Sequence, residues 1–317
     1  MSDIKILPLV ASTIKLFIIL MLFTSNSKAE ENNIKYYSDD KGILSLMYHR
    51  FDENKYPSTN IQMNVFKEHI KIIRSQNYKF YDPKYLEENF HIPKIDKKIL
   101  ITIDDAFSSF YKVAWPYLKE EKIPFILFVS TEAIGKNGYM TWKQIKEIEK
   151  ESFVYIGNHS HTHDYLVDLK NADFIDDIYT ATTIFKKQLG YNPIFFSYPF
   201  GEYSSLIKEY ISSNFKFSFG QHSGVIDRNK NPHELPRFPI NEKYGDLKRF
   251  EFLINLYPLQ YKNLFPSEKY LTNYSNPPEF YVEFFHEQKN IDNINCFSDE
   301  GDKWDKSNIS FKQNILN

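Results

Sequence analysis

Two segments of the chain combine residue types that could build a hydrolytic centre. Asp104 closes the apolar run at 98–104, and a second carboxylate, Asp105, follows directly. The segment HSHTH at 159–163 places three histidines within five positions, after another apolar run. Two imidazoles and one carboxylate hold a metal ion while leaving positions for water and substrate. These segments therefore indicate a metal-dependent hydrolase, provided that the fold brings them together.

Each segment also has a simpler interpretation. The histidines fit a polar loop whose imidazoles are solvated or cap the next turn. Asp105 fits the N-cap of a helix that begins near Ser108. A third segment, FFSYPFGEY at 195–203, contains Pro199 and Gly201 and fits an ordinary turn after a strand.

The elements around these segments predict how they are positioned. Short apolar runs alternate with helix-length amphipathic segments, which is typical of βα units with a mainly parallel sheet. Eight strands are expected, the number in a closed barrel, and in such a barrel the carboxyl ends of the strands share one rim. The expected strands are 43–49, 78–82, 98–104, 125–131, 153–159, 194–200, 216–220 and 235–240.

Helices are expected between these strands. After residue 256 the amino-acid composition changes. Thr141 and Asp173 are predicted N-caps, and Gly190 a predicted C-cap. Residues 257–317 are rich in Pro, Asn, Ser and Tyr and predict a small β-rich or irregular region. The expected helices are 64–76, 110–122, 141–151, 173–190 and 205–215.

Composition narrows the function classes. The 39 Lys and Arg residues nearly balance the 41 Asp and Glu residues, which argues against a nucleic-acid or membrane-surface partner. Cys296 is the single cysteine, so a disulfide framework or cysteine metal cluster within one chain is excluded. Any metal must therefore be held by histidines and carboxylates. The sequence does not define an oligomeric state.

Residues 1–29 predict export. Lys15 precedes the apolar run 16–23, and Ser27 and Ala29 are placed like the small residues of a cleavage site. The run is short for a membrane span, which needs about 20 residues. We expect a signal peptide cut after Ala29 and a periplasmic or extracellular protein. The alternative is an uncleaved N-terminal anchor, the one case in which a membrane would be a partner.

Three motifs, in order, resemble a known family. TIDDA at 102–106, HSHTH at 159–163 and SYPFG at 197–201 resemble the leading motifs of the polysaccharide deacetylases, the NodB-homology carbohydrate esterases of family 4. The resemblance covers roughly residues 43–241. LMYHRF at 46–51 and LPRFPI at 235–240 are similar to the exported branch that includes poly-N-acetylglucosamine deacetylases.

The resemblance implies a fold and an activity. The fold is an α/β structure, a distorted (β/α) barrel spanning residues 40–256, with 257–317 as a small β-rich appendage. The activity is hydrolysis of a carbon–nitrogen bond in a linear amide, removing acetyl groups from N-acetylated sugars of a polysaccharide or oligosaccharide. One divalent metal ion, usually zinc, is implied.

The resemblance also implies residue roles. Asp105, His159 and His163 match the metal ligands, and Asp104 matches the catalytic base. The backbone N–H of Phe200, in place of the usual tyrosine, matches the donor to the oxyanion.

Two family residues are missing. Ser197 replaces an arginine that orients the catalytic aspartate, and Arg237 is a candidate substitute, although a structural or surface ion pair explains it as well. The family's general acid comes from a late histidine motif that has no convincing match before the C-terminal region, which leaves His222 and His49 as candidates, or else the aspartate or a water.

These departures keep two other functions open. The first is a carbohydrate-binding protein that has kept the barrel but lost turnover. The second is an esterase acting on O-acetyl groups or a hydrolase of a non-sugar amide, because the same centre suits either carbonyl. The sequence does not identify the polymer.

Overall fold

The computed structural model describes residues 40–271, 276–285, 294–299 and 303–317. The predicted signal peptide or anchor at 1–29 lies outside these residues. Among the described helices, none combines the length and the apolar character that a membrane crossing requires.

The core of the fold is one sheet of eight parallel strands, and each strand falls within one of the eight predicted segments. Neighbours follow the order β10-β1-β5-β6-β7-β8-β9, with β4 paired to the first residues of β5. The strands are β1 (Ile43–Tyr48), β4 (Lys79–Phe80), β5 (Lys98–Ile103), β6 (Phe125–Val129), β7 (Val154–Asn158), β8 (Phe195–Ser197), β9 (Phe217–Phe219) and β10 (Phe238–Pro239).

The sheet curls into a distorted barrel. All six residues of β1 and all five of β6 are buried, as expected for parallel strands covered on both faces. Strands β9 and β10 end the sheet order, and a single parallel bridge between Phe219 and Leu235 links the two sides. The closed barrel suggested by the strand number is therefore incomplete at this seam.

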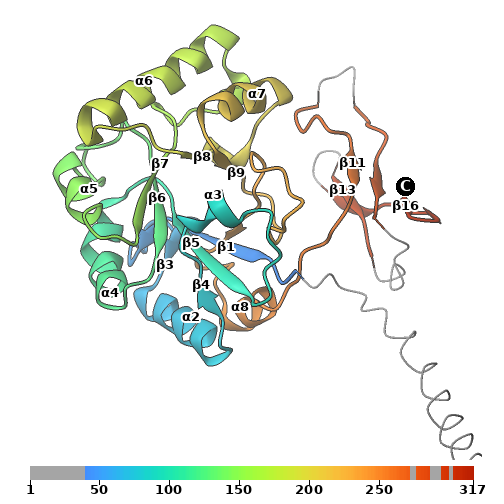
Figure 1. Ribbon diagram of the computed structural model, residues 1–317, viewed down its shortest axis with the longest axis horizontal. Coiled ribbons are helices and arrows are strands. Elements are labelled where there is room, and N and C mark those ends of the chain that lie inside the picture. Colours follow the sequence, from blue (N-terminus) through green and yellow to red (C-terminus); the bar gives the residue numbers. More distant parts are fainter. Residues whose placement is uncertain (1–39, 272–275, 286–293, 300–302) are drawn as a thin grey trace, which may run out of the picture. The chain divides into compact units, whose positions relative to one another are not determined.

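Helices surround the sheet (Figure 1). The five predicted helices are present, although 110–122 begins as a π-helical segment (Phe110–Ala114) before α4 (Trp115–Glu120). Thr141 caps its helix through a capping box, and Gly190 ends its helix in the left-handed conformation. Asp173 is not an N-cap: the helix begins at Asn171, with Lys170 at the N-cap position, and Asp173 lies in its first turn. The other helices are α2 (Met63–Ser75), α5 (Trp142–Ile148), α6 (Asn171–Leu189) and α7 (Ser205–Asn214).

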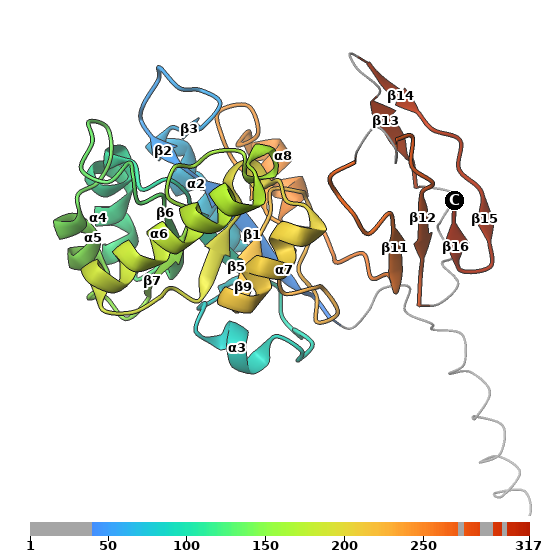
Figure 2. The same ribbon diagram turned by 90° about the horizontal axis from the view of Figure 1, so that it is seen from above.

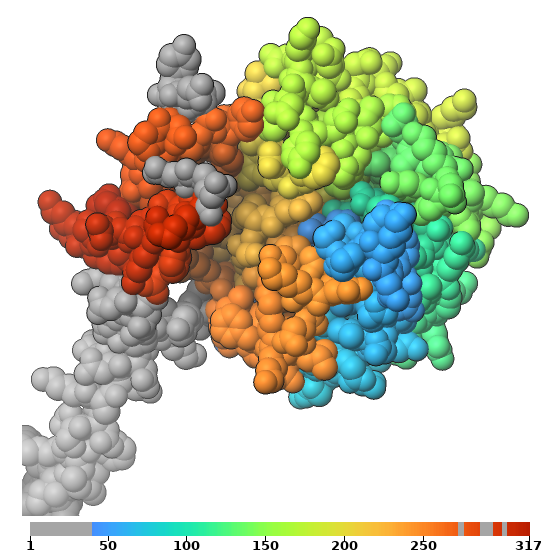
Figure 3. Space-filling view, turned by 180° about the vertical axis from the view of Figure 1, so that it is seen from behind, coloured from blue at the N-terminus to red at the C-terminus, as the bar shows by residue number. Residues whose placement is uncertain are grey.

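Several short elements were not predicted. They are β2 (Arg50–Phe51), β3 (Asn60–Ile61), α3 (Tyr85–Asn89) and α8 (Leu247–Leu253). Strands β2 and β3 lie in the segment after β1, which contacts the segment after β10: Asn60 Nδ2 donates to Glu242 at 2.6 Å and Asn241 Nδ2 to the Ser58 carbonyl at 2.8 Å. The two segments, coloured blue and orange, lie side by side in Figure 3.

The C-terminal region contains antiparallel sheets. Strands β11 (Asn263–Phe265), β12 (Tyr281–Glu283), β16 (Ile315–Leu316) and β15 (Phe311–Lys312) form one sheet in that order (Figure 2). Strands β13 (Phe297–Asp299) and β14 (Trp304–Lys306) form a separate pair. Three buried residues, Val282, Phe284 and Leu316, form a small core here.

Candidate metal centre

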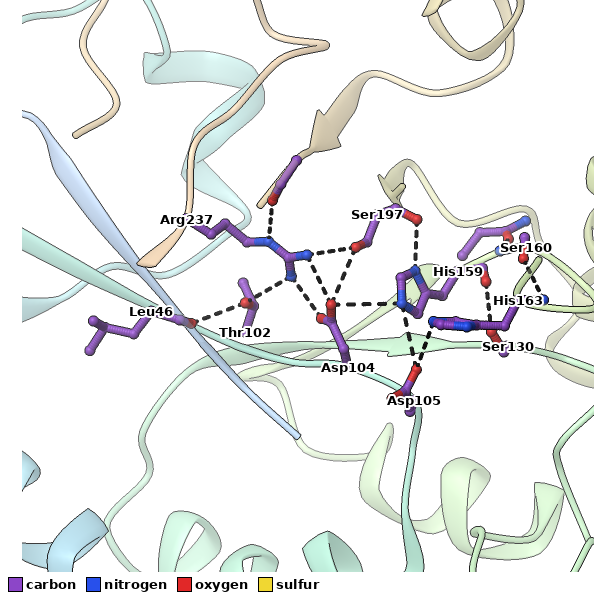
Figure 4. Close-up of polar contacts among 12 residues, drawn as sticks. Leu46, Thr102, Asp104, Asp105, Ser130, His159, Ser160, His163, Ser197 and Arg237 are labelled. Carbon is purple, nitrogen blue, oxygen red and sulfur yellow. Dashed lines mark hydrogen bonds and ion pairs between the residues drawn. The ribbon is translucent and has the colours of Figure 1, made fainter. Parts of the chain in front are cut away.

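The carboxyl ends of β5, β7 and β8 bring the three sequence segments together (Figure 4). Asp104 and Asp105 follow β5, the histidine segment follows β7, and Ser197 ends β8. These strands are parallel, so their carboxyl ends point to one rim. Arg237 reaches the same place from just before β10.

Asp105, His159 and His163 form a compact set of donor atoms, all within 4.8 Å of one another. Oδ1 of Asp105 lies 3.6 Å from Nε2 of His159 and 3.3 Å from Nε2 of His163. Two ligand atoms about 2.1 Å from a tetrahedral metal lie roughly 3.4 Å apart. The spacing and the nitrogen and oxygen donors therefore fit one divalent metal ion.

Hydrogen bonding orients the His159 ring toward this set. Its Nδ1 lies 2.7 Å from the Ser197 carbonyl, so an N–H there donates to the carbonyl and leaves Nε2 as the lone-pair nitrogen. The side chain is buried, and burial is the main cause that lowers the pKa of His159 to about 4, against the opposing charge of Asp104. A neutral imidazole is the form that binds a metal.

Asp177 holds the backbone of the histidine segment, a role that the sequence analysis missed. Its carboxylate accepts from the N–H of His161 at 2.7 Å and from the N–H and hydroxyl of Thr162 at 2.9 and 2.7 Å. The carboxylate is buried and lies on the apolar face of α6, between Phe174 and Ile178. An acidic residue on the buried face of a helix is the sequence feature that identifies it.

Asp104 is paired with Arg237 in the interior. NH1 and NH2 of the guanidinium donate to Oδ1 and Oδ2 at 2.7 and 2.9 Å, and NH2 also donates to Ser197 Oγ at 2.8 Å. Both side chains have no exposed surface. The guanidinium thus lies where the sequence analysis sought a substitute for the missing arginine, and the surface alternative is excluded by its burial.

The surroundings of Asp104 keep it ionised. Burial by itself raises the pKa of a carboxyl, but the charges of Arg237 and then His159 outweigh burial and lower the pKa of Asp104 to about 2. Its Oδ2 lies 3.7 Å from Nε2 of His159. Asp104 is therefore a buried carboxylate at the edge of the candidate metal site, whereas Asp105 faces both imidazoles.

Residues 91–215 match the family model for polysaccharide deacetylase. This match includes both aspartates, the histidine segment and the turn after β8, all on one rim. Over this segment, the chain is similar to the polysaccharide deacetylase family. This similarity and a relative named as an N-deacetylase support a hydrolase that acts on linear amides.

Two relatives document the likeness to this deacetylase family. The poly-beta-1,6-N-acetyl-D-glucosamine N-deacetylase of Staphylococcus aureus is 23% identical over 239 residues, covering 64% of this chain and 80% of the relative. The solved structure of IcaB from Ammonifex degensii is 25% identical with a TM-score of 0.61, covering 68% of this chain and 98% of that chain.

A further solved structure supports the deacetylase fold. The Streptococcus pyogenes deacetylase PplD, in complex with acetate, is 21% identical with a TM-score of 0.62 and covers 68% of this chain and all of that chain (100%). The family model ends at residue 215, so Arg237 lies beyond it.

The motif SYPFG forms a strained turn beside the candidate metal ligands. Phe200 has φ 57° and ψ 1°, and Gly201 donates its N–H to the Tyr198 carbonyl at 2.8 Å. Within the described residues, the Phe200 N–H donates to no protein acceptor. The turn therefore offers one backbone donor near the candidate metal site.

Left-handed backbone is concentrated at this rim. Five of the nine described non-glycine residues with positive φ lie in the three motifs. Each such residue costs on the order of 1 kcal/mol or more, and such strain persists where the surroundings hold a functional geometry. The five are Asp105, Ala106, Ser160, His163 and Phe200.

The two candidate general acids lie in different places. The Asp104 N–H donates to the Tyr48 carbonyl at 2.9 Å, so His49 follows β1 directly beside Asp104, and its charge contributes to the low pKa of that carboxyl. His222 is exposed and lines a cleft of about 830 Å³ together with Lys230 and Glu234. Among the described residues, the donor set of Asp105, His159 and His163 does not include His222.

Proposed function

We propose that this chain is an exported, metal-dependent deacetylase that removes acetyl groups from N-acetylglucosamine units of a polysaccharide. The observation that carries the proposal is the set formed by Asp105, His159 and His163 beside the buried pair of Asp104 and Arg237. The family match and the relative that acts on poly-β-1,6-N-acetylglucosamine support the substrate class.

Asp105, His159 and His163 would hold the metal ion, and the nitrogen and oxygen donors suit zinc. A bound divalent ion supplies hydroxide near neutral pH, because it lowers the pKa of water from 15.7 to about 7, and it polarises a carbonyl. His163 and Asp105 are partly exposed, so substrate and solvent can reach the site.

Asp104 would take the proton from the attacking water. The low pKa keeps the carboxylate ionised at neutral pH, and it also means that a captured proton is released readily. Arg237 would fix the carboxylate in place through two hydrogen bonds, while Ser197 supports the guanidinium. Arg237 is a positioning residue in this account.

The Phe200 N–H would stabilise the negative charge that develops on the carbonyl oxygen. Removing one donor of this kind typically costs about 3 to 4 kcal/mol of transition-state stabilisation. The donor is a backbone group, so phenylalanine serves as well as the tyrosine usual in the family.

His49 would protonate the leaving amine. Its position after β1, beside Asp104, supports it over His222, whose side chain lines the cleft described above. We expect His49→Gln to lower kcat by roughly 10² to 10⁴, the usual contribution of a general acid, and His222→Gln to leave kcat unchanged.

Export is proposed from residues 1–29. The apolar run after Lys15 and the small residues Ser27 and Ala29 support a signal peptide. Expression with export, followed by N-terminal sequencing, should give a chain beginning at Glu30. A chain that retains Met1 and sediments with membranes would favour the anchor instead.

The activity is tested by acetate release from matched glycans. The full chain, loaded with zinc, should release acetate from N-acetylglucosamine oligomers, and a chelator should stop the release. Acetate from an O-acetylated glycan alone would make the chain an esterase. Glycan binding without acetate from either substrate would make it a carbohydrate-binding protein.

A further inference from the structure

Two exposed aromatic rings are stacked face to face at the edge of the candidate site. The rings of Tyr165 and Phe200 have centroids 3.7 Å apart and an interplanar angle of 4°. They remain 43% and 39% exposed, so burial alone does not explain their contact. Tyr165 follows the histidine segment and Phe200 lies in the turn after β8, so the stack joins two of the three motifs.

The stack continues into the metal ligands. The edge of the Phe200 ring packs against His163, with centroids 4.8 Å apart and an angle of 64°. His163 in turn packs against His159 at 4.8 Å and 76°. The Phe200 ring therefore contacts both Tyr165 and a candidate metal ligand, His163.

Phe200 needs such support because of its backbone. Its φ of 57° is unfavourable for a residue with a side chain, and the conformation persists only when its surroundings hold it. Next to Phe200 the turn is closely packed, since a Cβ on Gly201 would lie 2.6 Å from the Gln221 backbone nitrogen. The Phe200 side chain itself is contacted by the stacked Tyr165 ring.

The base of Tyr165 is firmly held. The next residue, Leu166, is buried in a cluster with Tyr198 and Tyr203, which flank the turn on either side. The hydroxyl of Tyr165 makes no hydrogen bond with any described residue, so the ring is the part of the side chain in contact. Tyr165 thus stacks its ring on Phe200 from a backbone position next to a buried residue.

We propose that Tyr165 is a positioning residue that fixes the Phe200 turn, and with it the direction of the Phe200 N–H. The proposal rests on the proposed function, in which this N–H is the oxyanion donor. Tyr165 acts through Phe200 and does not touch the reacting atoms. An error of about 1 Å in such a donor costs up to about 100-fold in rate.

The test compares Tyr165→Ala and Tyr165→Phe in the zinc-loaded full chain, with Tyr179→Ala as the control. Tyr179 is 65% exposed on α6 and lies outside the three motifs. We expect Tyr165→Ala to lower kcat on N-acetylglucosamine oligomers at least tenfold, with KM, Tm and zinc content near wild type. Tyr165→Phe and Tyr179→Ala should stay within twofold of wild-type kcat.

Several outcomes would overturn the proposal. An unchanged kcat in Tyr165→Ala would remove the positioning role. An equal loss in Tyr165→Phe would assign the effect to the hydroxyl, and a raised KM with wild-type kcat would make the ring a sugar contact.

A second readout does not need turnover. The backbone amide signals of Phe200 and Gly201 in ¹H–¹⁵N spectra should shift or broaden in Tyr165→Ala and match wild type in Tyr165→Phe. If wild type releases no acetate while these signals behave as expected, the proposed function fails and the positioning role stands. Unperturbed signals in Tyr165→Ala would end the positioning role whatever the activity.

Discussion

At Asp104 and Asp105, two identical side chains on neighbouring residues meet different surroundings. Asp104 has no exposed surface and is bound by a guanidinium, whereas Asp105 is partly exposed and faces two imidazole nitrogens. Both residues follow the end of β5 at Ile103, and Asp105 has a left-handed φ of 72°, so the two side chains leave backbone of different conformation. In the proposed mechanism, these different environments would assign proton transfer to Asp104 and metal binding to Asp105.

Metal content should separate the two aspartates. Asp105→Ala removes a ligand and should leave less than one zinc per chain after dialysis. Asp104→Asn should keep one zinc but lose roughly 10² to 10⁴ in kcat, because the amide cannot take a proton. Elemental analysis and acetate release measure the two effects. The matched control is Asp164→Asn, because Asp164 is an exposed neighbour of His163. Zinc loss in Asp104→Asn would contradict the assignment of metal binding to Asp105 and proton transfer to Asp104.

Arg237 should be important for stability as well as for position. Arg237→Ala leaves the Asp104 carboxylate buried without its partner, a change that typically costs 3 to 5 kcal/mol. Urea denaturation measures the loss. The free energy of unfolding should fall less in the double variant Asp104→Asn with Arg237→Leu than the summed losses of the single variants Asp104→Asn and Arg237→Leu. The reason is that the double variant leaves no charge buried. Additive losses would indicate that the pair has no coupling.

Among the helices, α2 packs on α8 through His69, a buried histidine whose pKa differs from its ordinary value. His69 is fully buried, stacks on Phe250 at 3.8 Å, and its Nε2 lies 2.8 Å from the Gly245 carbonyl. Burial is the main cause that lowers the pKa of His69 to about 4, against the Gly245 hydrogen bond, which raises it. Protonation of this side chain therefore opposes the packing of the two helices.

Because of His69, we expect the stability of the folded chain to fall in acid. The unfolded chain binds the proton near pH 6.5 and the folded chain near pH 4, so the free energy of unfolding falls as pH drops through that interval. We expect His69 to account for a loss of about 2 kcal/mol between pH 7 and pH 5. Urea denaturation at both pH values, in wild type and His69→Gln, isolates this share. Equal losses in the two proteins would exclude His69 as the cause.

The strands were predictable because buried parallel strands are continuous apolar runs in the sequence. The placement of the three motifs on one rim was also predictable, because the carboxyl ends of parallel strands lie at the same end of a barrel. The pairing of Arg237 with Asp104 joins residues 133 positions apart, which residue spacing does not reveal. The two-residue strands β2 and β3 have no periodicity to detect. Asp173 has the residue type of an N-cap, but α6 begins before it at Asn171, after Lys170, which makes no side-chain cap hydrogen bond, so residue type alone did not locate the start.

At the scale of the whole molecule, the deacetylase barrel and the C-terminal strands have separate buried cores. The two regions contact each other: the Glu268 carboxylate accepts from the Ser205 N–H at 3.0 Å, and the Lys230 Nζ lies 3.9 Å from the centroid of the Tyr261 ring. The boundary near residue 256 stays a prediction from the sequence.

Truncation tests that boundary. A chain ending at residue 256 keeps all three motifs and Arg237, so it should fold and retain kcat within a few-fold of the full chain. Circular dichroism, zinc content and acetate release check this. Aggregation of the shortened chain, with the full chain soluble, would show that residues 257–317 belong to the barrel's folding unit.

In the proposed function, a metal ion held by Asp105, His159 and His163 acts with Asp104 to remove acetyl groups from N-acetylglucosamine. Its most direct test is acetate release from N-acetylglucosamine oligomers by the zinc-loaded full chain, compared with Asp104→Asn carrying the same zinc. We expect wild type to release acetate steadily until a chelator is added, and the variant to release acetate at least a hundredfold more slowly. Equal release by the two proteins, or none by wild type with zinc bound, would contradict it.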